Sequence, residues 1–306
     1  MLPGFSFWVH LLPCRQMLKS YLLAVRPKTL PAAIVPVWVG CVLAWQLVGD
    51  LDEILALCTL LGALCIQVAT NLFNDAVDAE KGADTAARLG PKRVTASGML
   101  SKRAVYLGAV LFLVLACLAA IPLIQARGWV IIAIGLPSLY LSYGYTGGPL
   151  PLAYRGLGEL FVILFFGVVA VGGTTFVQTG RWGWEAAVLG LQVGLLSAVL
   201  IAINNLRDVA EDRQSGKRTL SVRFGPRSGH LLVKGMILSA MVLTTCGHWY
   251  GARWFFLLSV PWFLLGITLV RAVARKAPGP IYNFYLALAA LQLILFAVAF
   301  TVAVII

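Results

Sequence analysis

Long apolar runs separated by short polar segments are the main pattern of this chain. A helix that crosses a bilayer needs about 20 mostly apolar residues. The segments between the runs are too short for a soluble domain. We therefore predict an all-α polytopic membrane protein in which residues 1–306 form one intramembrane domain. Its nine predicted transmembrane helices are 29–48, 53–74, 103–124, 128–145, 157–177, 185–206, 229–248, 252–272 and 283–305.

The composition agrees with a membrane protein. Of the 306 residues, 60% are apolar and 12% are charged, whereas a soluble globular protein has about 25% charged residues. These values exclude an ordinary soluble enzyme, a disordered chain and a soluble nucleic-acid-binding protein, although the net charge is +12. The partner that this composition indicates is the lipid bilayer, with no nucleic acid. The six cysteines lack the spacing of a metal or redox motif, so we expect them only to pack.

The distribution of basic residues orients the predicted helices. With nine spans and a cytoplasmic N-terminus, only Arg127, Arg181 and Arg253 of the 24 Lys and Arg residues lie outside. Cytoplasmic loops of membrane proteins carry an excess of Lys and Arg, and the opposite orientation would reverse this bias. We expect a multi-pass protein of the cell (inner) membrane, with the N-terminal segment 1–28 in the cytoplasm.

Acidic residues gather in two of the predicted cytoplasmic loops, 75–102 and 207–228, which hold seven of the twelve Asp and Glu residues. If the helix at 53–74 continues inward, one of its faces carries Asn71, Asn74, Asp75 and Asp78. The second loop has a similar spacing in Asn205, Asp208 and Asp212. The two loops resemble each other and lie four helices apart, so we predict two four-helix repeats followed by a ninth helix.

The clustered carboxylates need a partner of opposite charge. They follow the C-terminal ends of helices, where the helix dipole disfavours an anion by about 0.3–1 kcal/mol, and acids on one face repel each other. Mg²⁺ offsets both effects, and proteins usually hold this ion by a few carboxylates together with substrate phosphates. The nearby cations then suit a diphosphate or a substrate carboxylate. They are Lys28, Lys92, Arg93, Lys217 and Arg218.

The rest of such a substrate would be a lipid that lies among the apolar helices. Tyr143, Tyr145 and Tyr154 follow the fourth helix and are candidates for the cavity wall, because an aromatic face attracts a cation. Two simpler interpretations stay open. In the first, the two acidic loops are only solvated segments of mixed charge. In the second, the tyrosines only anchor a helix at the membrane interface.

Four stretches carry a resemblance to a known family. They are 26–40, 74–94, 143–159 and 204–225, of which the second reads NDAVDAEKGADTAARLGPKRV and the fourth NNLRDVAEDRQSGKRTLSVRFG. In this order, with acidic loops after the second and sixth helices, they resemble the UbiA superfamily of intramembrane prenyltransferases. Within it, they are similar to the 1,4-dihydroxy-2-naphthoate polyprenyltransferases of menaquinone synthesis.

The resemblance implies a UbiA-like fold and a Mg²⁺-dependent enzyme. Its members join a polyprenyl group from polyprenyl diphosphate to an aromatic ring, and the naphthoate branch also releases CO₂. Asn71 and Asn74 match the first motif; with Asn205, Tyr143 and the five basic residues above they form the expected substrate-binding set. The residues that match as catalytic metal ligands are Asp75, Asp78, Asp208 and Asp212.

Two alternatives stay open. The first is the same chemistry on 4-hydroxybenzoate or homogentisate, although Gly82 stands where the benzoate branch has a further aspartate. In the naphthoate branch, Asp84 matches a trailing acid of the motif. The second alternative is a membrane transporter. It is less favoured, because the carboxylates gather on one side of the membrane and repeats of four helices are parallel rather than inverted.

Overall fold

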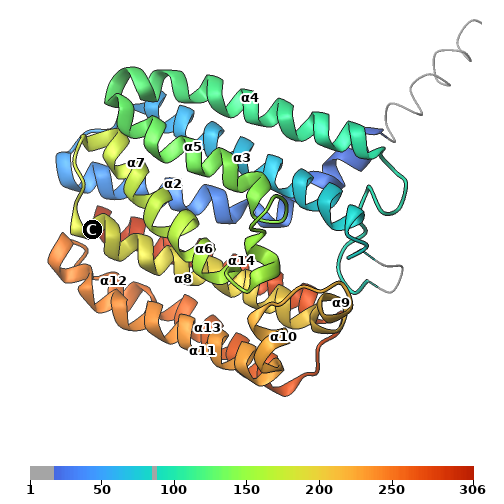
Figure 1. Cartoon of the computed structure of the whole chain (residues 1–306). Helices are drawn as coiled ribbons and strands as arrows, with labels where there is room; N and C mark the ends of the chain where they lie inside the picture. Colours follow the sequence, from blue (N-terminus) through green and yellow to red (C-terminus); the bar gives the residue numbers. More distant parts are fainter. Residues whose placement is uncertain (1–16, 85–87) are drawn as a thin grey trace, which may run out of the picture.

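A computed structural model describes residues 17–84 and 88–306. In this part of the chain all regular structure is helical and no strand occurs, which confirms the all-α prediction (Figure 1). Residues 17–25 are helical. The elements that follow are η1 (Pro27–Thr29), α2 (Pro31–Val48), α3 (Glu53–Glu80), α4 (Lys102–Arg127), α5 (Trp129–Gly144), η2 (Leu152–Arg155), α6 (Gly158–Val162), η3 (Ile163–Val169), α7 (Ala170–Thr179), α8 (Trp184–Arg207), α9 (Val209–Gln214), α10 (Leu220–Phe224), α11 (Pro226–Leu243), η4 (Thr244–Tyr250), α12 (Phe255–Leu258), α13 (Val260–Arg275) and α14 (Tyr282–Ile305).

Seven helical runs within the described residues are long and apolar enough to cross a membrane. One of them joins α6, η3 and α7 into a single run, in which η3 is a π-helix. These runs confirm a multi-pass membrane protein. They are Pro31–Val48, Glu53–Glu80, Lys102–Arg127, Gly158–Thr179, Trp184–Arg207, Pro226–Tyr250 and Tyr282–Ile305.

The other two predicted spans are weaker in the structure. α5 has 16 residues and contains Pro137. The segment predicted at 252–272 is divided at Ser259 into α12 and α13, and α13 carries Arg271 and Arg275. With 16 residues each, α5 and α13 are both shorter than the about 20 residues that a full span requires. The total of nine spans and the two four-helix repeats therefore stay predictions.

The two segments predicted as cytoplasmic loops contain helix. α3 continues to Glu80, so residues 75–80 are helical, and segment 207–228 contains α9 and α10. The continuation of α3 places Asn71, Asp75 and Asp78 on its buried side. Both acidic segments lie at the same end of the bundle, on the right in Figure 1. The predicted helical spacing of the polar residues after 74 is thus present.

Capping side chains fix where several helices begin. Asp52, Ser101 and Thr219 each accept a hydrogen bond from the backbone N–H three residues later. These bonds satisfy N–H groups that have no partner inside α3, α4 and α10. At the other end, Gly49 and Gly180 terminate α2 and α7 with φ angles of 73° and 71°, which an L side chain rarely adopts.

α8 lies at the centre of the bundle and is the most buried of the seven runs. It packs against η3, α11 and α14. Glycines permit the closest of these contacts: a Cβ on Gly190 would lie 2.8 Å from the Val168 Cα, and one on Gly194 would lie 2.9 Å from the Ile163 Cα. Small residues allow helices in lipid to approach closely, so that dispersion contacts stabilise the pair.

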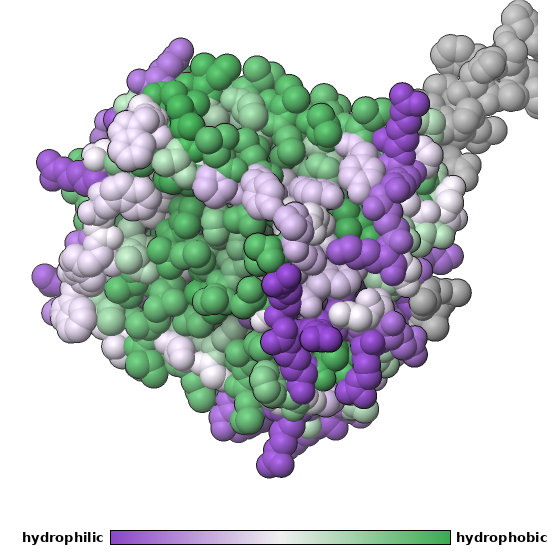
Figure 2. All heavy atoms as spheres, in the orientation of Figure 1, coloured by the Kyte–Doolittle hydropathy of each residue, from purple (hydrophilic) through white to green (hydrophobic). Residues whose placement is uncertain are grey.

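Large apolar side chains cover the outside of the bundle, among them Leu57, Leu111, Leu136, Leu164 and Leu264. Figure 2 shows one face whose middle is mostly hydrophobic, while hydrophilic residues gather at the edge where α9 and α10 lie. Soluble monomers rarely expose an apolar surface of this extent. The surface therefore suits contact with lipid, with the acidic end of the bundle at the water interface.

A cavity of about 1060 Å³ runs between α2, α3, α4, α5, α7 and α8. Along α3 it extends from Asp78 to Thr59, which lie about 28 Å apart at the rise of an α-helix. This length is close to the thickness of the hydrocarbon core, about 30 Å. The cavity thus connects the acidic end of the bundle with its apolar interior.

Candidate active site at the acidic end of the bundle

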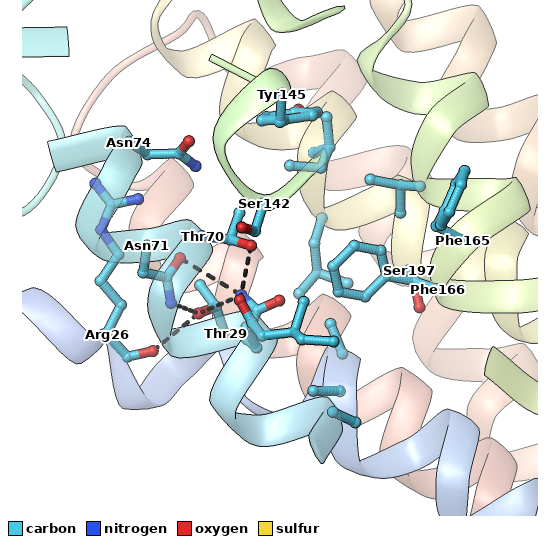
Figure 3. Close-up of a pocket in the computed structure, with 18 of the residues that line it drawn as sticks. Arg26, Thr29, Thr70, Asn71, Asn74, Ser142, Tyr145, Phe165, Phe166 and Ser197 are labelled. Atoms are coloured by element: carbon cyan, nitrogen blue, oxygen red, sulfur yellow. Dashed lines mark hydrogen bonds between the residues drawn. The ribbon is translucent and has the colours of Figure 1, made fainter. Parts of the chain in front are cut away.

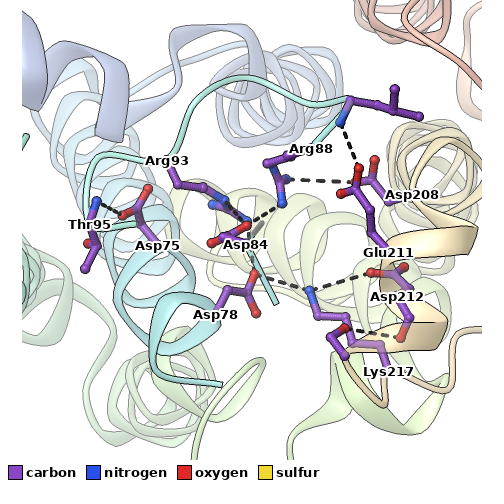
Figure 4. Close-up of polar contacts among 12 residues, drawn as sticks. Asp75, Asp78, Asp84, Arg88, Arg93, Thr95, Asp208, Glu211, Asp212 and Lys217 are labelled. Atoms are coloured by element: carbon purple, nitrogen blue, oxygen red, sulfur yellow. Dashed lines mark hydrogen bonds and ion pairs between the residues drawn. The ribbon is translucent and has the colours of Figure 1, made fainter. Parts of the chain in front are cut away.

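Asp78 lies where the two acidic segments meet. Its side chain is near the C-terminal end of α3, and the residue is only 2% exposed. Its Oδ2 lies 3.0 Å from Arg93 Nη2 and 3.2 Å from Lys217 Nζ, and its Oδ1 accepts a hydrogen bond from the Tyr154 hydroxyl at 2.9 Å. Lys217 follows Asp78 by 139 positions in the chain. One carboxylate therefore contacts residues from both halves of the protein (Figure 4).

Asp75 has different partners on the same helix. Its two carboxylate oxygens accept hydrogen bonds from the backbone N–H groups of Val94 at 3.2 Å and Thr95 at 2.8 Å. The carboxylate therefore holds the loop after α3 against the helix. In this arrangement Asp75 positions the segment that carries Arg93.

Asp208 lies at the junction of α8 and α9, where the chain leaves the membrane-spanning helix. Its oxygens lie 2.6 Å from Arg207 Nε and 2.7 Å from Arg207 Nη2, and Oδ2 is 3.9 Å from Arg88 Nη2. Arg88 also pairs with Asp84. Because Asp84 belongs to the first acidic segment, Arg88 connects that segment with the second.

Lys217 makes a second connection between the two segments. Its Nζ lies 3.2 Å from Asp78 Oδ2 and 3.9 Å from Asp212 Oδ1. Glu211 adds a third, since its Oε1 accepts a hydrogen bond from the Leu89 backbone N–H at 2.8 Å. Acidic and basic side chains from both segments thus form one polar cluster at the acidic end of the bundle (Figure 4).

Burial raises the pKa of two carboxyl groups in this cluster. It brings the pKa of Asp212 to about 7 and that of Asp84 to about 6, because a low-dielectric environment disfavours the charged form. Lys217 lowers the pKa of Asp212 and Arg88 lowers that of Asp84, but neither effect outweighs burial. A further positive charge would therefore stabilise both carboxylates.

Most of the predicted substrate-binding residues line the polar part of the cavity. Figure 3 shows Arg26 and Asn74 on one side of the pocket, and Phe165 and Phe166 on the other. The polar and apolar parts therefore form one continuous space. The predicted residues that line it are Lys28, Asn71, Asn74, Asp78, Arg93, Asn205 and Lys217.

Hydrogen bonds fix the two asparagines of α3. Asn71 Nδ2 donates to the Val25 carbonyl at 2.8 Å and to Thr29 Oγ1 at 3.0 Å. Asn74 Oδ1 accepts a hydrogen bond from the Thr146 hydroxyl. Asn71 thus positions the segment before α2, while Asn74 is connected to the loop after α5.

Three predicted substrate-binding residues do not reach the cavity. Lys92 and Arg218 are exposed. In each of the two Lys-Arg pairs only one residue lines the cavity, Arg93 in the first segment and Lys217 in the second. Tyr143 is 36% exposed and packs edge-on against Phe73 at a centroid distance of 5.4 Å. Tyr145 lines the cavity in its place, since it lies two positions further along the turn.

Among the other residues that line the cavity, Glu159, Arg207 and Asn283 were given no role from the sequence, and Arg26, the neighbour of Lys28 at the cavity mouth, also lines it. Arg26 has a φ of 55°, in the left-handed region. It precedes a proline, which disfavours right-handed helical backbone at the residue before it, and strained backbone of this kind clusters at functional sites. Asn283 has no comparable local signal, because its contact with Arg207 joins residues 76 positions apart.

The donor set of the cluster suits Mg²⁺, because carboxylate oxygens are the hard ligands that this ion prefers. Within residues 17–84 and 88–306, no three His, Cys, Asp or Glu side chains are grouped closely enough to hold a metal ion by themselves. Mg²⁺ usually takes one or two carboxylates and completes its shell with water and substrate phosphates. Asp78, Asp208 and Asp212 fit that role, and Asp84 Oδ2 is a buried oxygen without a hydrogen-bond partner.

Comparison with known proteins decides the family. Residues 33–294 match the UbiA prenyltransferase family. The chain belongs to the UbiA prenyltransferase family. The resemblance inferred from the sequence motifs is thereby confirmed, and this family member is a membrane-embedded prenyltransferase.

Several curated relatives of this UbiA family member share one name. A 1,4-dihydroxy-2-naphthoate octaprenyltransferase of Mycobacterium tuberculosis is 33% identical over 264 residues, which cover 84% of each chain. A protein of the same name from Escherichia coli is 32% identical, over 79% of this chain and 82% of the relative. The similarity thus extends over most of both proteins and includes both acidic segments.

Solved structures share the fold of this UbiA family member. A UbiA homologue from Aeropyrum pernix K1 superposes with a TM-score of 0.70 at 16% identity, covering 90% of this chain and 98% of that one. A UbiA homologue from Archaeoglobus fulgidus, bound to GPP and Mg²⁺, gives a TM-score of 0.67 at 15% identity, over 94% and 100%. At these identities the likeness establishes the fold alone.

Proposed function

We propose that this protein transfers a polyprenyl group from polyprenyl diphosphate to 1,4-dihydroxy-2-naphthoate, with Mg²⁺ as cofactor. The reaction releases CO₂ and diphosphate and gives demethylmenaquinol, a precursor of menaquinone. The observation that carries the proposal is the polar cluster in which Lys217 and Arg88 connect two acidic segments beside a long apolar cavity. The names of the curated relatives support the choice of acceptor, and the homologue bound to Mg²⁺ supports the cofactor.

The diphosphate is the part of the substrate that this cluster recognises. Arg93, Lys217 and Arg88 now pair with carboxylates, and each can instead donate to phosphate oxygens, Arg in bidentate fashion. Asp78 and Asp212 then release Lys217 and become free to bind a cation. Mg²⁺, when bound, neutralises the charge that builds on the diphosphate as the allylic C–O bond breaks.

The polyprenyl chain occupies the apolar part of the cavity. The whole cavity is about 28 Å long by the rise of α3, and Phe165 and Phe166 contribute to the wall of its apolar part. An apolar enclosure excludes water, which would otherwise react with the allylic cation. Aromatic faces also attract a cation, so Phe165 and Tyr145 favour the charge-separated state.

The acceptor enters the same cavity at its polar end. Arg26 and Lys28 line this part of the wall and complement the carboxylate of a naphthoate. The clustering of basic residues at this end of the bundle supports a cytoplasmic orientation by the positive-inside rule. Both substrates then reach the site from the inner side of a cell membrane.

The experiment uses protein purified in detergent, a polyprenyl diphosphate and three separate acceptors: 1,4-dihydroxy-2-naphthoate, 4-hydroxybenzoate and homogentisate. We expect a prenylated product with the naphthoate, together with CO₂ release, and we expect EDTA to abolish and Mg²⁺ to restore the reaction. A product only with the benzoate or homogentisate assigns the other acceptor. No transfer to any of the three contradicts the proposed function.

A further inference from the structure

Glu159 is a buried acid that neither the metal nor the diphosphate assignment uses. It lies in α6, at the start of the run that continues through η3 and α7, and it lines the cavity. The residue is 3% exposed. One oxygen, Oε1, accepts a hydrogen bond from Asn205 Nδ2 at 2.8 Å, whereas Oε2 has no hydrogen-bond partner.

An unpaired carboxylate oxygen in this position is costly. Burying a charged group without partners destabilises a protein even after relaxation, and the favourable helix dipole at the start of α6 offsets only part of that cost. The bond from Asn205 accounts for one of the two oxygens. The second oxygen is therefore suited to a donor that is supplied by a ligand.

The surroundings of Glu159 suit a flat aromatic ligand. A Cβ on the preceding Gly158 would lie 2.8 Å from the Tyr145 hydroxyl, so the glycine permits Tyr145 to pack beside Glu159. The rings of Tyr145 and Phe161 are 5.7 Å apart, and those of Phe161 and Phe165 stack at 4.5 Å. Tyr145, Phe161 and Phe165 all line the same cavity as Glu159 and offer a row of aromatic rings along its wall.

We propose that Glu159 binds the aromatic acceptor: Oε2 accepts a hydrogen bond from a ring hydroxyl, while Asn205 holds Oε1. This inference rests on the proposed function. The same negative charge repels the carboxylate of the acceptor, which turns toward the cationic wall at Arg26 and Lys28. Glu159 thereby orients the ring as well as binding it.

Glu159→Gln distinguishes the roles of the two carboxylate oxygens. The amide oxygen of Gln still accepts the bond from Asn205, but its NH₂ group now occupies the position of Oε2 and donates instead of accepting. Because hydrogen bonds to charged groups are among the stronger ones, we expect the KM for 1,4-dihydroxy-2-naphthoate to rise about tenfold or more. The KM for the polyprenyl diphosphate stays within about twofold of wild type, since that substrate does not contact Glu159.

Glu185→Gln is the matched control. Glu185 lies in the first turn of α8, at the opposite end of this helix from Asp208, and it is not among the residues that line the cavity. The same chemical change there leaves the KM for the acceptor within about twofold of wild type.

Acceptor analogues test the contact itself. 1-Hydroxy-2-naphthoate and 4-hydroxy-2-naphthoate, each lacking one ring hydroxyl, are measured as competitive inhibitors of wild type and Glu159→Gln. The inhibitor that keeps the hydroxyl bonded to Glu159 binds the variant about tenfold more weakly than it binds wild type. The other inhibitor binds both proteins equally, because the hydroxyl that interacts with Glu159 is already absent from it. If the variant does not fold, the two inhibitors are compared on wild type, which binds one about tenfold more tightly than the other.

These experiments distinguish a wrong role for Glu159 from a wrong proposed function. Wild type that prenylates the naphthoate, with an unchanged acceptor KM in Glu159→Gln and no coupling to either hydroxyl, overturns the role of Glu159 and leaves the proposed reaction intact. Equal losses for both substrates assign Glu159 to the structure around Asn205 and also overturn the proposal. If wild type prenylates another phenol instead, the proposed acceptor is wrong, and the same coupling measured with that phenol decides the role of Glu159.

Discussion

At the scale of single residues, the site depends on charges that compensate one another. Asp78 contacts Arg93, Lys217 and the Tyr154 hydroxyl, so its charge is balanced before any substrate binds. Ion pairs that are buried and hydrogen-bonded resist loss of one partner, because the other is left uncompensated. A ligand that brings both negative charge and metal ions can replace these ion pairs, because its phosphates pair with the basic residues and its metal ions pair with the carboxylate.

Lys217→Met tests this exchange at one side chain. Lys217 lines the cavity, whereas Lys92 is exposed, so Lys92→Met is the matched control. We expect the KM for the polyprenyl diphosphate to rise about tenfold in Lys217→Met, because a charge-assisted contact to phosphate is lost. Steady-state kinetics at saturating acceptor measure it. A larger effect in Lys92→Met than in Lys217→Met contradicts the structure.

At the scale of elements, close packing around α8 keeps the cavity wall in place. η3 departs from regular α-helix over Ile163–Val169, and Phe165 and Phe166 on this segment line the cavity. π-helical segments occur frequently at functional sites. Because Gly190 and Gly194 bring α8 close to this segment, the position of the wall depends on two residues that have no side chain.

Gly194→Leu tests that packing. A Cβ at this position already meets the backbone of Ile163, whereas a Cβ on Gly235 of α11 meets nothing within 4 Å. We expect Gly194→Leu to lose about 1–3 kcal/mol of stability, as overpacked cores do, and Gly235→Leu to keep the stability of wild type. Thermal unfolding of the detergent-purified proteins measures the difference. Equal melting temperatures for the two variants would show that α8 and η3 are not in tight contact.

The sequence predicts the elements better than their contacts. Apolar runs indicate spanning helices because each helix satisfies its own backbone in lipid, and the spacing of Asn71, Asp75 and Asp78 predicts the inward extension of α3 before any tertiary contact is known. The pairing of Asp78 with Lys217 crosses 139 positions and has no periodic signal. Arg26 differs, because the proline after it already disfavours right-handed helical backbone at this residue, but that local signal does not predict that Arg26 lines the cavity.

At the scale of the whole molecule, the protein joins a charged site to an apolar space of nearly membrane thickness. The cavity reaches from Asp78 to Thr59 along α3, and its remote walls include the small residues Gly62, Ala63, Gly135 and Gly173. Small side chains leave room for the far end of a long hydrocarbon. We therefore expect the length of prenyl chain that the enzyme accepts to depend on this part of the cavity.

Gly135→Phe tests the dependence on chain length. Gly135 lines the cavity, and nothing lies within 4 Å of a Cβ placed on it, so a ring has space to enter. We expect kcat/KM for octaprenyl diphosphate to fall about tenfold more than that for geranyl diphosphate, because only the longer chain reaches this position. Gly235→Phe, on α11 outside the cavity, affects both substrates equally. Equal losses in Gly135→Phe place the chain elsewhere.

The proposed site requires that aspartates from both acidic segments hold the same metal ions with the diphosphate. Binding of Mn²⁺, a spectroscopic substitute for Mg²⁺ at oxygen ligands, is measured by electron paramagnetic resonance with and without inorganic diphosphate. We expect diphosphate-dependent binding by wild type, and a loss of about tenfold or more in affinity for each of Asp78→Asn and Asp212→Asn. If either variant alone binds Mn²⁺ and diphosphate as tightly as wild type, the two segments do not share the ion and the proposed metal site is wrong.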